Sequence, residues 1–155
     1  MKKYFRRTEL SIESLHGSQF NDILLGNTGN NMIKGGLGND TLTGNAGQDG
    51  FVFDTALNAS SNKDVIADFN VTDDTIYLEN SIFAKLTTVG GLSITNFCSN
   101  ATGIASDADD FIVYNSTTGL LSYDADGNGA GASVAFAIMG VSTHPTLTAA
   151  DFIVT

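Results

Sequence analysis

Acidic and amide side chains recur at a fixed spacing between residues 22 and 49. They lie nine residues apart, a glycine stands five positions before each of them, and a large apolar residue follows two positions later. The oxygens of carboxylates, amides and backbone carbonyls are the ligands that hard cations such as Ca²⁺ prefer. The chemistry that this spacing suggests is therefore cation binding, and its side chains are Asp22, Asn31, Asp40 and Asp49.

The spacing comes from four gapless nine-residue blocks over residues 17–52: GSQFNDILL, GNTGNNMIK, GGLGNDTLT and GNAGQDGFV. We predict that each block forms a six-residue turn followed by a three-residue strand. Strand side chains alternate, so the eighth position would point inward while the seventh and ninth point outward. Stacked blocks would then build a narrow apolar core from Leu24, Ile33, Leu42 and Phe51.

The turns of these blocks have the composition of a cation cradle. Glycine lets the turn backbone curl so that its carbonyl oxygens point into a shared hollow, and the acid at the sixth position points there too. A Gly/Asn-rich β-solenoid without metal is the alternative. It leaves unexplained why three carboxylates fall at one phase of the repeat, where stacking would bring like charges together.

The blocks resemble the RTX nonapeptide repeat, whose pattern is Gly-Gly-x-Gly-x-Asp-x-apolar-x. The resemblance implies a parallel β-roll with two repeats per coil and Ca²⁺ held between the turns of repeats i and i+2. It pairs Asp22 with Asp40 on one side of the roll and Asn31 with Asp49 on the other. Backbone carbonyls would complete the shells, from Ser18, Phe20, Asn27, Gly29, Gly35, Leu37, Gly44 and Ala46.

The sequence departs from the RTX pattern in its first two blocks. Phe20 stands where a glycine is expected and Ser18 is also not glycine, which predicts a strained or partly formed first turn. Asn31 is neutral, so we expect the Asn31/Asp49 site to bind calcium more weakly than the Asp22/Asp40 site.

The segment after the repeats reads as further strands. Its stretch Asp-Val-Ile-Ala-Asp-Phe, residues 64–69, resembles the one that caps the roll in secreted RTX proteins. Asp64 or Asp68 could therefore ligate a further Ca²⁺, or both could be solvated acids at a strand edge. We interpret the neighbouring pair Asp73 and Asp74 as turn acids.

The C-terminal part predicts strands over 111–115, 120–124 and 133–139. In the loop that begins at Asp124, Asp124, Asp126 and Asn128 fall at positions 1, 3 and 5 of an EF-hand and Gly129 falls at position 6. Ala135, however, stands at position 12, where an EF-hand has its bidentate Glu. The loop is therefore either a glycine-rich hairpin turn or a weak cation site. The end predicts one helical turn capped by Thr148 and then a short strand, and its acid followed by apolar residues resembles the uncleaved signal of type I secretion substrates.

Composition excludes several classes of function. The formal net charge is −10, and four of the seven basic residues lie in the first seven positions, which argues against nucleic acid as a partner. No apolar run approaches the length of a transmembrane segment. The zinc-protease, nucleophile-elbow and Walker motifs are all missing from the sequence, so we expect no enzyme.

Together these observations predict an all-β fold, in which a short calcium-binding parallel β-roll packs on a mostly antiparallel, sandwich-like or jelly-roll-like C-terminal part. Residues 1–16 would be a lead-in, 17–53 the roll, and 54–155 the C-terminal β region with its secretion-like tail. The resemblance, which extends to the C-terminal domains of serralysins and alginate epimerases, implies a module exported by the type I apparatus of a Gram-negative bacterium. It would fold outside the cell on binding Ca²⁺ and stabilise or deliver itself or an attached domain. An extracellular polysaccharide-binding accessory module is the alternative.

Overall fold

The computed structural model describes residues 4–5 and 14–155, so most of the predicted lead-in lies outside the described residues. The repeat blocks form short strands joined by six-residue turns, as predicted. Each strand begins at or beside the seventh position of its block, and the eighth residue is almost completely buried. The blocks form β3 (Ile23–Leu25), β4 (Met32–Lys34), β5 (Thr41–Thr43) and β6 (Gly50–Phe53), and β1 (Tyr4–Phe5) and β2 (Ser14–His16) precede them.

Eight more strands follow the repeats. Two of them, β7 and β8, come directly after the roll, and the others form the C-terminal part. They are β7 (Asp64–Ile66), β8 (Thr75–Leu78), β9 (Gly90–Gly91), β10 (Phe97–Asn100), β11 (Ile112–Asn115), β12 (Leu120–Tyr123), β13 (Val134–Met139) and β14 (Phe152–Val154).

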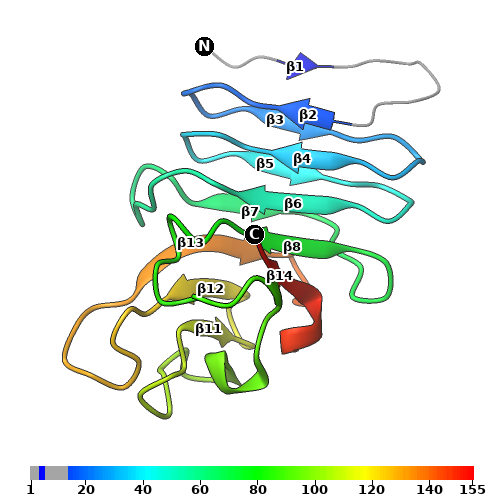
Figure 1. The fold of residues 1–155 in the computed structure, drawn as a ribbon. Coiled ribbons are helices and arrows are strands. Elements are labelled where there is room, and N and C mark those ends of the chain that lie inside the picture. Colours follow the sequence, from blue (N-terminus) through cyan, green and yellow to red (C-terminus); the bar gives the residue numbers. More distant parts are fainter. Residues whose placement is uncertain (1–3, 6–13) are drawn as a thin grey trace.

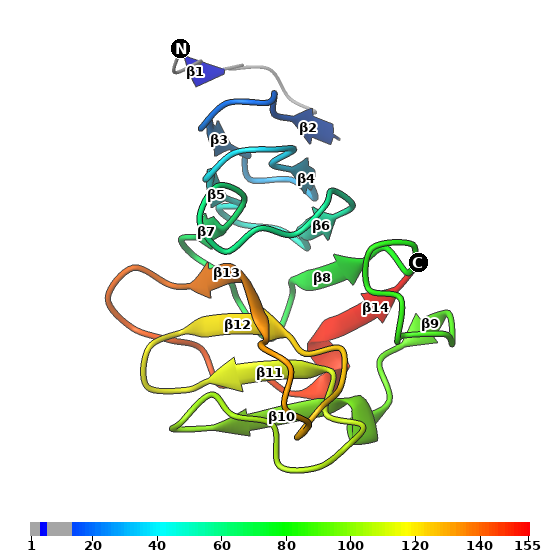
Figure 2. The ribbon, with the colours of Figure 1, turned by 90° about the vertical axis from the view of Figure 1, so that its left-hand side faces the viewer.

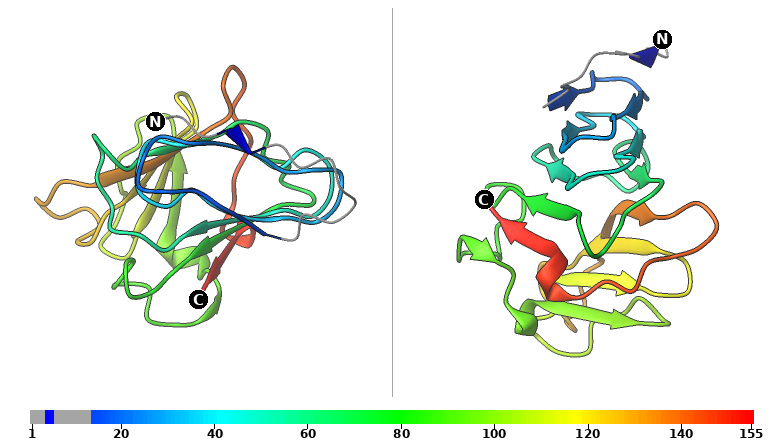
Figure 3. Two further views of the ribbon diagram at one scale, coloured as in Figure 1. Left: turned by 90° about the horizontal axis from the view of Figure 1, so that it is seen from above. Right: turned by 90° about the vertical axis from the view of Figure 1, so that its right-hand side faces the viewer.

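Successive strands of the roll alternate between two sheets. The eight-stranded sheet has the order β1-β3-β5-β7-β13-β12-β11-β10, and the six-stranded sheet has the order β2-β4-β6-β8-β14-β9. Figure 1 shows the coils stacked from the N-terminal end downward, and Figure 2 shows the two columns of strands edge-on. Seen from above in Figure 3, the coils superimpose as a flattened loop with a row of turns at each end.

The parallel ladders continue past the repeats. β7 pairs with β5 and β8 pairs with β6, both in parallel, and β13 and β14 then pair in parallel with β7 and β8. β7 and β8 therefore lie directly beneath the repeats, and two strands from much later in the chain extend the ladders by one more level. The predicted domain boundary at residue 53 stays a prediction.

The C-terminal part is built mainly from antiparallel neighbours. β11 pairs with β12 and β12 with β13, and the loop that begins at Asp124 joins the second pair as a hairpin. The sheet is not purely antiparallel, because β10 pairs in parallel with β11 and β13 pairs in parallel with β7. The fold class is confirmed as all-β, with two mixed sheets.

One apolar core runs through the roll and the C-terminal part. It begins with the inward residues of the coils and continues below them into a group of aromatic rings. There Phe136 makes edge-on contacts with Phe53, at 5.0 Å between ring centroids, and with Phe83, at 5.1 Å. The roll therefore depends on the C-terminal part for burial of its last coil.

Helical structure is limited to two short 3-10 turns in the described part of the chain. They are η1 (Ile94–Asn96) and η2 (Ala149–Asp151), and η2 has the predicted Thr148 cap. Within residues 4–5 and 14–155 no helix has the length and apolar character needed to cross a membrane.

Candidate metal sites in the turns of the roll

The sixth-position side chains form two columns, one along each row of turns. The Asp22 column contains Asp22, Asp40 and Asp64, and the Asp49 column contains Asn31, Asp49 and Asp74. Parallel register sets both columns, because Thr41 lies opposite Val65 and Gly50 lies opposite Thr75. All six side chains are at least nine-tenths buried.

Hydrogen bonds link the Asp22 column from coil to coil. The backbone N–H of Asp22 donates to Asp40 Oδ1 at 2.8 Å, and the N–H of Asp40 donates to Asp64 Oδ1 at 3.0 Å. Each lower carboxylate therefore uses one oxygen to hold the turn above it. The structure thus places Asp22 beside Asp40, as predicted, and it places Asp64 directly below them.

Three carboxylate oxygens in the two columns lack hydrogen-bond partners. Asp22 Oδ1, Asp40 Oδ2 and Asp49 Oδ2 are buried atoms with none. A buried carboxylate oxygen without a partner is costly unless a cation or a proton satisfies it. These oxygens therefore fit a hard cation, which supplies the missing charge and accepts the lone pairs.

Glycine at the first position leaves room beside these oxygens. A Cβ built on Gly35 would contact Asp40 Oδ2 and would lie 2.7 Å from Asp64 Oδ2. These two oxygens thus lie beside the same glycine, and a side chain there would fill the space next to them.

Burial changes the acidity of this column. Desolvation raises the pKa of Asp40 to about 6 and that of Asp64 to about 7; in each case the backbone hydrogen bond lowers the pKa and the neighbouring carboxylate raises it. Desolvation outweighs the hydrogen bond in both. The charged forms therefore need a positive partner at neutral pH.

The Asp49 column follows the same pattern with one neutral member. The N–H of Asn31 donates to Asp49 Oδ1 at 2.8 Å, and the N–H of Asp49 donates to Asp74 Oδ1 at 3.0 Å. The side chain of Asn31 also accepts the N–H of Asn27 in its own turn. Asp74 was not expected here: the sequence interpretation made it a turn acid, whereas the structure buries it in the column.

The turns of the third and fourth repeats differ from the first two. Gly36 and Gly38 have φ of 92° and 123°, and Asn45 and Gly47 have φ of 72° and 124°. Residues 17–31 contain no positive φ, in keeping with the non-glycine residues at Ser18 and Phe20. The left-handed cradle is therefore best developed at the turns that carry Asp40 and Asp49.

Several of the predicted carbonyl ligands lie between stacked turns. A Cβ built on Gly17 would contact the carbonyl oxygen of Gly35, and a Cβ built on Gly26 would lie 2.5 Å from the carbonyl oxygen of Gly44. The carbonyls of Phe20 and Gly29 lie beside Gly38 and Gly47 in the same way. The carbonyl of Ser18 accepts the N–H of Leu37. The structure thus brings carbonyl oxygens and carboxylates to the same gaps.

The second uncertain acid, Asp68, holds the fourth turn through its backbone. Its two oxygens accept the N–H groups of Gly44 at 2.9 Å and Asn45 at 2.8 Å. Of the two acids in the 64–69 stretch, only Asp64 continues a column of sixth-position acids. The sequence left the choice open, and calcium binding by either residue stays a prediction.

A second set of hydrogen bonds, which the sequence interpretation missed, runs the opposite way. The fifth-position residue of the upper turn accepts the N–H of the turn below: Asn21 from Asn39, Asn39 from Lys63, and Asn30 from Gln48, at 2.8 to 2.9 Å. With the acid bonds described above, three pairs of turns exchange one hydrogen bond in each direction: those of Asp22 and Asp40, of Asp40 and Asp64, and of Asn31 and Asp49. We call this arrangement the reciprocal clamp. Its only signal in the sequence is the Asn or Gln at position five.

Side chains alone do not build a metal site in the described part of the chain. Within it, no group of three or more His, Cys, Asp or Glu side chains is placed to hold an ion. An ion between two turns would thus take one carboxylate or amide from each turn and complete its shell with backbone carbonyls.

The repeats of the chain resemble those of a known protein family. No curated protein matches the chain. A family model described as the RTX calcium-binding nonapeptide repeat matches residues 16–51 with four copies. The matched residues are those whose turns carry Asp22, Asn31, Asp40 and Asp49, and RTX nonapeptide repeats are calcium-binding motifs. The segment 16–51 is therefore an array of RTX repeats.

Proposed function

We propose that the chain is a calcium-binding module that folds when Ca²⁺ occupies the turns of its roll. The observation that carries this proposal is the set of buried carboxylate oxygens without hydrogen-bond partners at Asp22, Asp40 and Asp49. Protein carboxylates in that state repel one another and resist burial, whereas Ca²⁺ prefers such oxygens.

The energetics couple binding to folding. An unfolded chain cannot bring Asp40 and Asp64 together, so the free energy of calcium binding becomes free energy of folding. Extracellular calcium modules bind in roughly the 10⁻⁴–10⁻³ M range, far above cytosolic calcium. The module would stay loosely folded inside the cell and fold outside it.

We further propose export by a type I apparatus. RTX-repeat proteins are typically secreted by Gram-negative bacteria. The tail supports the proposal, because Asp151 and the apolar β14 have the order of residues that resembles a type I signal. The folded module would then stabilise itself or an attached domain, and we propose no enzymatic activity for it.

The first experiment is a calcium titration followed by far-UV circular dichroism. The proposal expects a cooperative gain of β signal with Ca²⁺ in the millimolar range, and a much smaller response to Mg²⁺, which keeps its waters and demands octahedral geometry. A protein that is already fully and cooperatively folded in excess chelator would contradict it.

A second candidate function is polysaccharide binding, favoured by one pocket in the C-terminal part. Its lining combines hydroxyl, amide and ammonium groups with an apolar floor, from Lys85, Thr87, Thr88, Ser93, Asn96, Leu86, Leu92, Phe111 and Val154. Retardation on immobilised polysaccharide in calcium, abolished by Asn96→Ala, would support it. Elution at the column volume would leave calcium-dependent folding as the function.

A further inference from the structure

The fourth repeat has a glycine at a position where the other three repeats have a side chain. Gly50 stands at the seventh position, which Ile23, Met32 and Thr41 occupy in the other blocks. The backbone does not require this glycine, because Gly50 pairs in regular register with Met32 and Thr75 and its φ is not positive. A glycine in a strand often marks a place where another group approaches closely.

Two side chains of the outer face of the six-stranded sheet lie over Gly50. A Cβ built on Gly50 would lie 2.7 Å from Met32 Sδ and 2.8 Å from Tyr77 Cε2. Both residues point away from the core and are partly exposed. The thioether and the ring thus form an apolar and polarisable surface that the missing side chain allows to lie against the strand.

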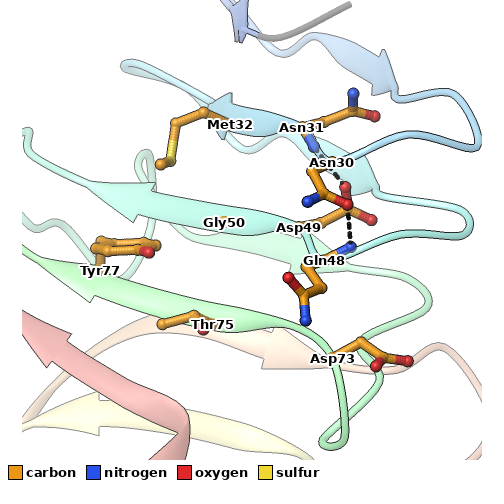
Figure 4. A pocket seen from close by; sticks show the side chains of 9 residues that line it. All are labelled: Asn30, Asn31, Met32, Gln48, Asp49, Gly50, Asp73, Thr75 and Tyr77. Carbon is orange, nitrogen blue, oxygen red and sulfur yellow. Dashed lines mark hydrogen bonds between the residues drawn. The ribbon is translucent and has the colours of Figure 1, made fainter.

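This surface is one end of an open pocket of about 370 Å³. Figure 4 shows Met32 and Tyr77 at one end, Asp73 and Gln48 toward the other, and Gly50 between them. A volume of this order holds a small molecule or a single long side chain. The pocket therefore has an apolar end and a polar end.

The polar end is acidic and partly fixed in place. The exposed carboxylate of Asp73 accepts a hydrogen bond from Asn70 Nδ2 at 2.8 Å. Asn30 Oδ1 accepts the backbone N–H of Gln48 at 2.9 Å, which orients the Asn30 amide. Among the described residues, those that line the pocket include no Lys, Arg or His.

We propose that this pocket binds an organic cation, namely an ammonium group carried on an aliphatic stem. The stem lies against Met32 and Tyr77, as the stems of lysine side chains lie along apolar surface while their charged ends stay in water. The ring of Tyr77 also attracts a cation through its face. The ammonium group is bound by the carboxylate of Asp73 and the side-chain oxygen of Gln48.

The charge around the pocket favours a cation over an anion. The chain has a formal net charge of −10, and Lys34, two residues after Met32 on β4, is already paired with Asp54 at 2.7 Å. Asp73 belongs to neither column of sixth-position residues. An organic cation at Asp73 therefore does not compete with calcium for the carboxylates of the turns, and the inference goes beyond the function proposed above.

Two sources could supply this chemistry, a free aliphatic amine and a lysine side chain of another protein. The test is a set of heteronuclear NMR titrations of the full chain in saturating calcium. The probes are cadaverine, lysine capped at both ends as an amide, and pentanol as an uncharged analogue. At least one of the two cations should shift the amide signals of Gln48, Gly50 and Thr75 saturably and less strongly at high salt, whereas pentanol should not.

Asp73→Asn should weaken binding of the cation by at least about threefold, as expected for loss of an exposed ion pair. Asp109→Asn is the matched control, because it removes the same charge from an exposed residue that does not line the pocket. Tyr77→Ala tests the apolar end and should also weaken binding, without changing any charge.

Stronger binding of the capped lysine would support a protein side chain as the ligand, and stronger binding of cadaverine would support a free amine. The inference is overturned if neither cation shifts these signals, if pentanol binds equally well, or if Asp73→Asn and Asp109→Asn behave alike. Shifts from a neutral oligosaccharide alone would also overturn it. Each of these results leaves calcium-dependent folding intact, whereas wild-type spectra that calcium does not change would overturn the proposed function instead.

Discussion

Asp64 holds Asp40 by accepting its backbone N–H at 3.0 Å, while the second oxygens of both carboxylates turn toward Gly35. One oxygen of Asp64 thus sets the distance between coils, and the other remains available to an ion. Because the same carboxylate joins neighbouring coils and faces the candidate site, loss of the ion should destabilise the fold.

Replacing Asp40 by Asn should change stability with opposite signs in the two conditions. Asn keeps an oxygen for the N–H of Asp22 but removes a charge that faces both neighbours. In calcium, the titration midpoint should rise by at least about tenfold, or ~1.4 kcal/mol. In chelator the variant should show more residual β signal than wild type, because repulsion with Asp64 is relieved.

Circular dichroism with and without calcium measures both effects of Asp40→Asn. Asp54→Asn is the control, since Asp54 pairs with Lys34 at 2.7 Å in a partly exposed salt bridge of small expected value. Equal midpoints for Asp40→Asn and wild type would remove Asp40 from the set of ligands.

Gly35→Ala should prevent calcium binding without changing any charge. The added Cβ would occupy the space onto which Asp40 Oδ2 and Asp64 Oδ2 converge. Gly91→Ala is the matched control, because a Cβ there meets nothing within 4 Å. Isothermal titration calorimetry should show weaker or fewer binding events for Gly35→Ala alone, and wild-type binding by this variant would contradict the assignment of the cradle.

Stability without calcium should increase as the pH falls from 8 to 5. The folded-state pKa values of Asp64 and Asp40, about 7 and about 6, lie above the ordinary value of 3.8. Such acids stabilise the fold when protonated, and this contribution is lost as the pH rises through 6 and 7. The far-UV β signal of the protein in chelator should therefore be larger at pH 5 than at pH 8.

Calcium should show the opposite pH dependence, because protons compete for the same oxygens. The gain of β signal on adding calcium should be large at pH 8 and small at pH 5. In Asp64→Asn the dependence of the β signal on pH in chelator should flatten. If the wild-type β signal in chelator falls as the pH is lowered from 8 to 5, the buried acids do not control apo stability.

The reciprocal clamp predicts a role for Asn39 that is independent of calcium ligation. Asn39→Ala removes the bond from the Lys63 N–H and should cost ~1 kcal/mol in urea unfolding at saturating calcium. Asn39→Asp keeps an acceptor oxygen and should recover most of that loss. Equal destabilisation by both variants would show that the acceptor oxygen is not what matters.

Strand β14 should be required for the roll even in calcium. Phe152 is fully buried and contacts Phe97 at 5.3 Å between ring centroids, so Phe152→Ala should cost about 3–5 kcal/mol. Ile153 points to the other face and is half-buried, so Ile153→Ala should cost far less. Calcium-induced β signal of wild-type size in Phe152→Ala would contradict this coupling.

The repeat pattern predicts the upper coils well because each of its signals is local. The period of nine predicts the strands and the buried eighth positions, and the resemblance to RTX repeats implies the pairing of Asp22 with Asp40. The structure agrees with each. The Thr148 cap and the short strand after it were predicted from adjacent residues for the same reason.

Long-range pairing is what the sequence could not predict. Asp74 is placed by the register of β8 against β6, and no glycine or repeat spacing near it announces a turn of the roll. Its one signal is that an acid directly precedes an alternating strand, as Asp22, Asp40 and Asp49 do. The addition of β13 and β14 to the ladders depends on partners far apart in sequence, which local patterns do not encode.

The pairing of β13 and β14 with β7 and β8 predicts two phases of folding with different rates. Turns of the repeat array meet partners only 18 residues away, so their loops close quickly. The contacts of β13 and β14 with β7 and β8 enclose the whole of β9 to β12 and have high contact order, which slows their formation. We therefore expect the repeat array to stay partly formed until β13 and β14 pair with β7 and β8. The rate of this final folding step should depend on the C-terminal strands and little on the number of repeats.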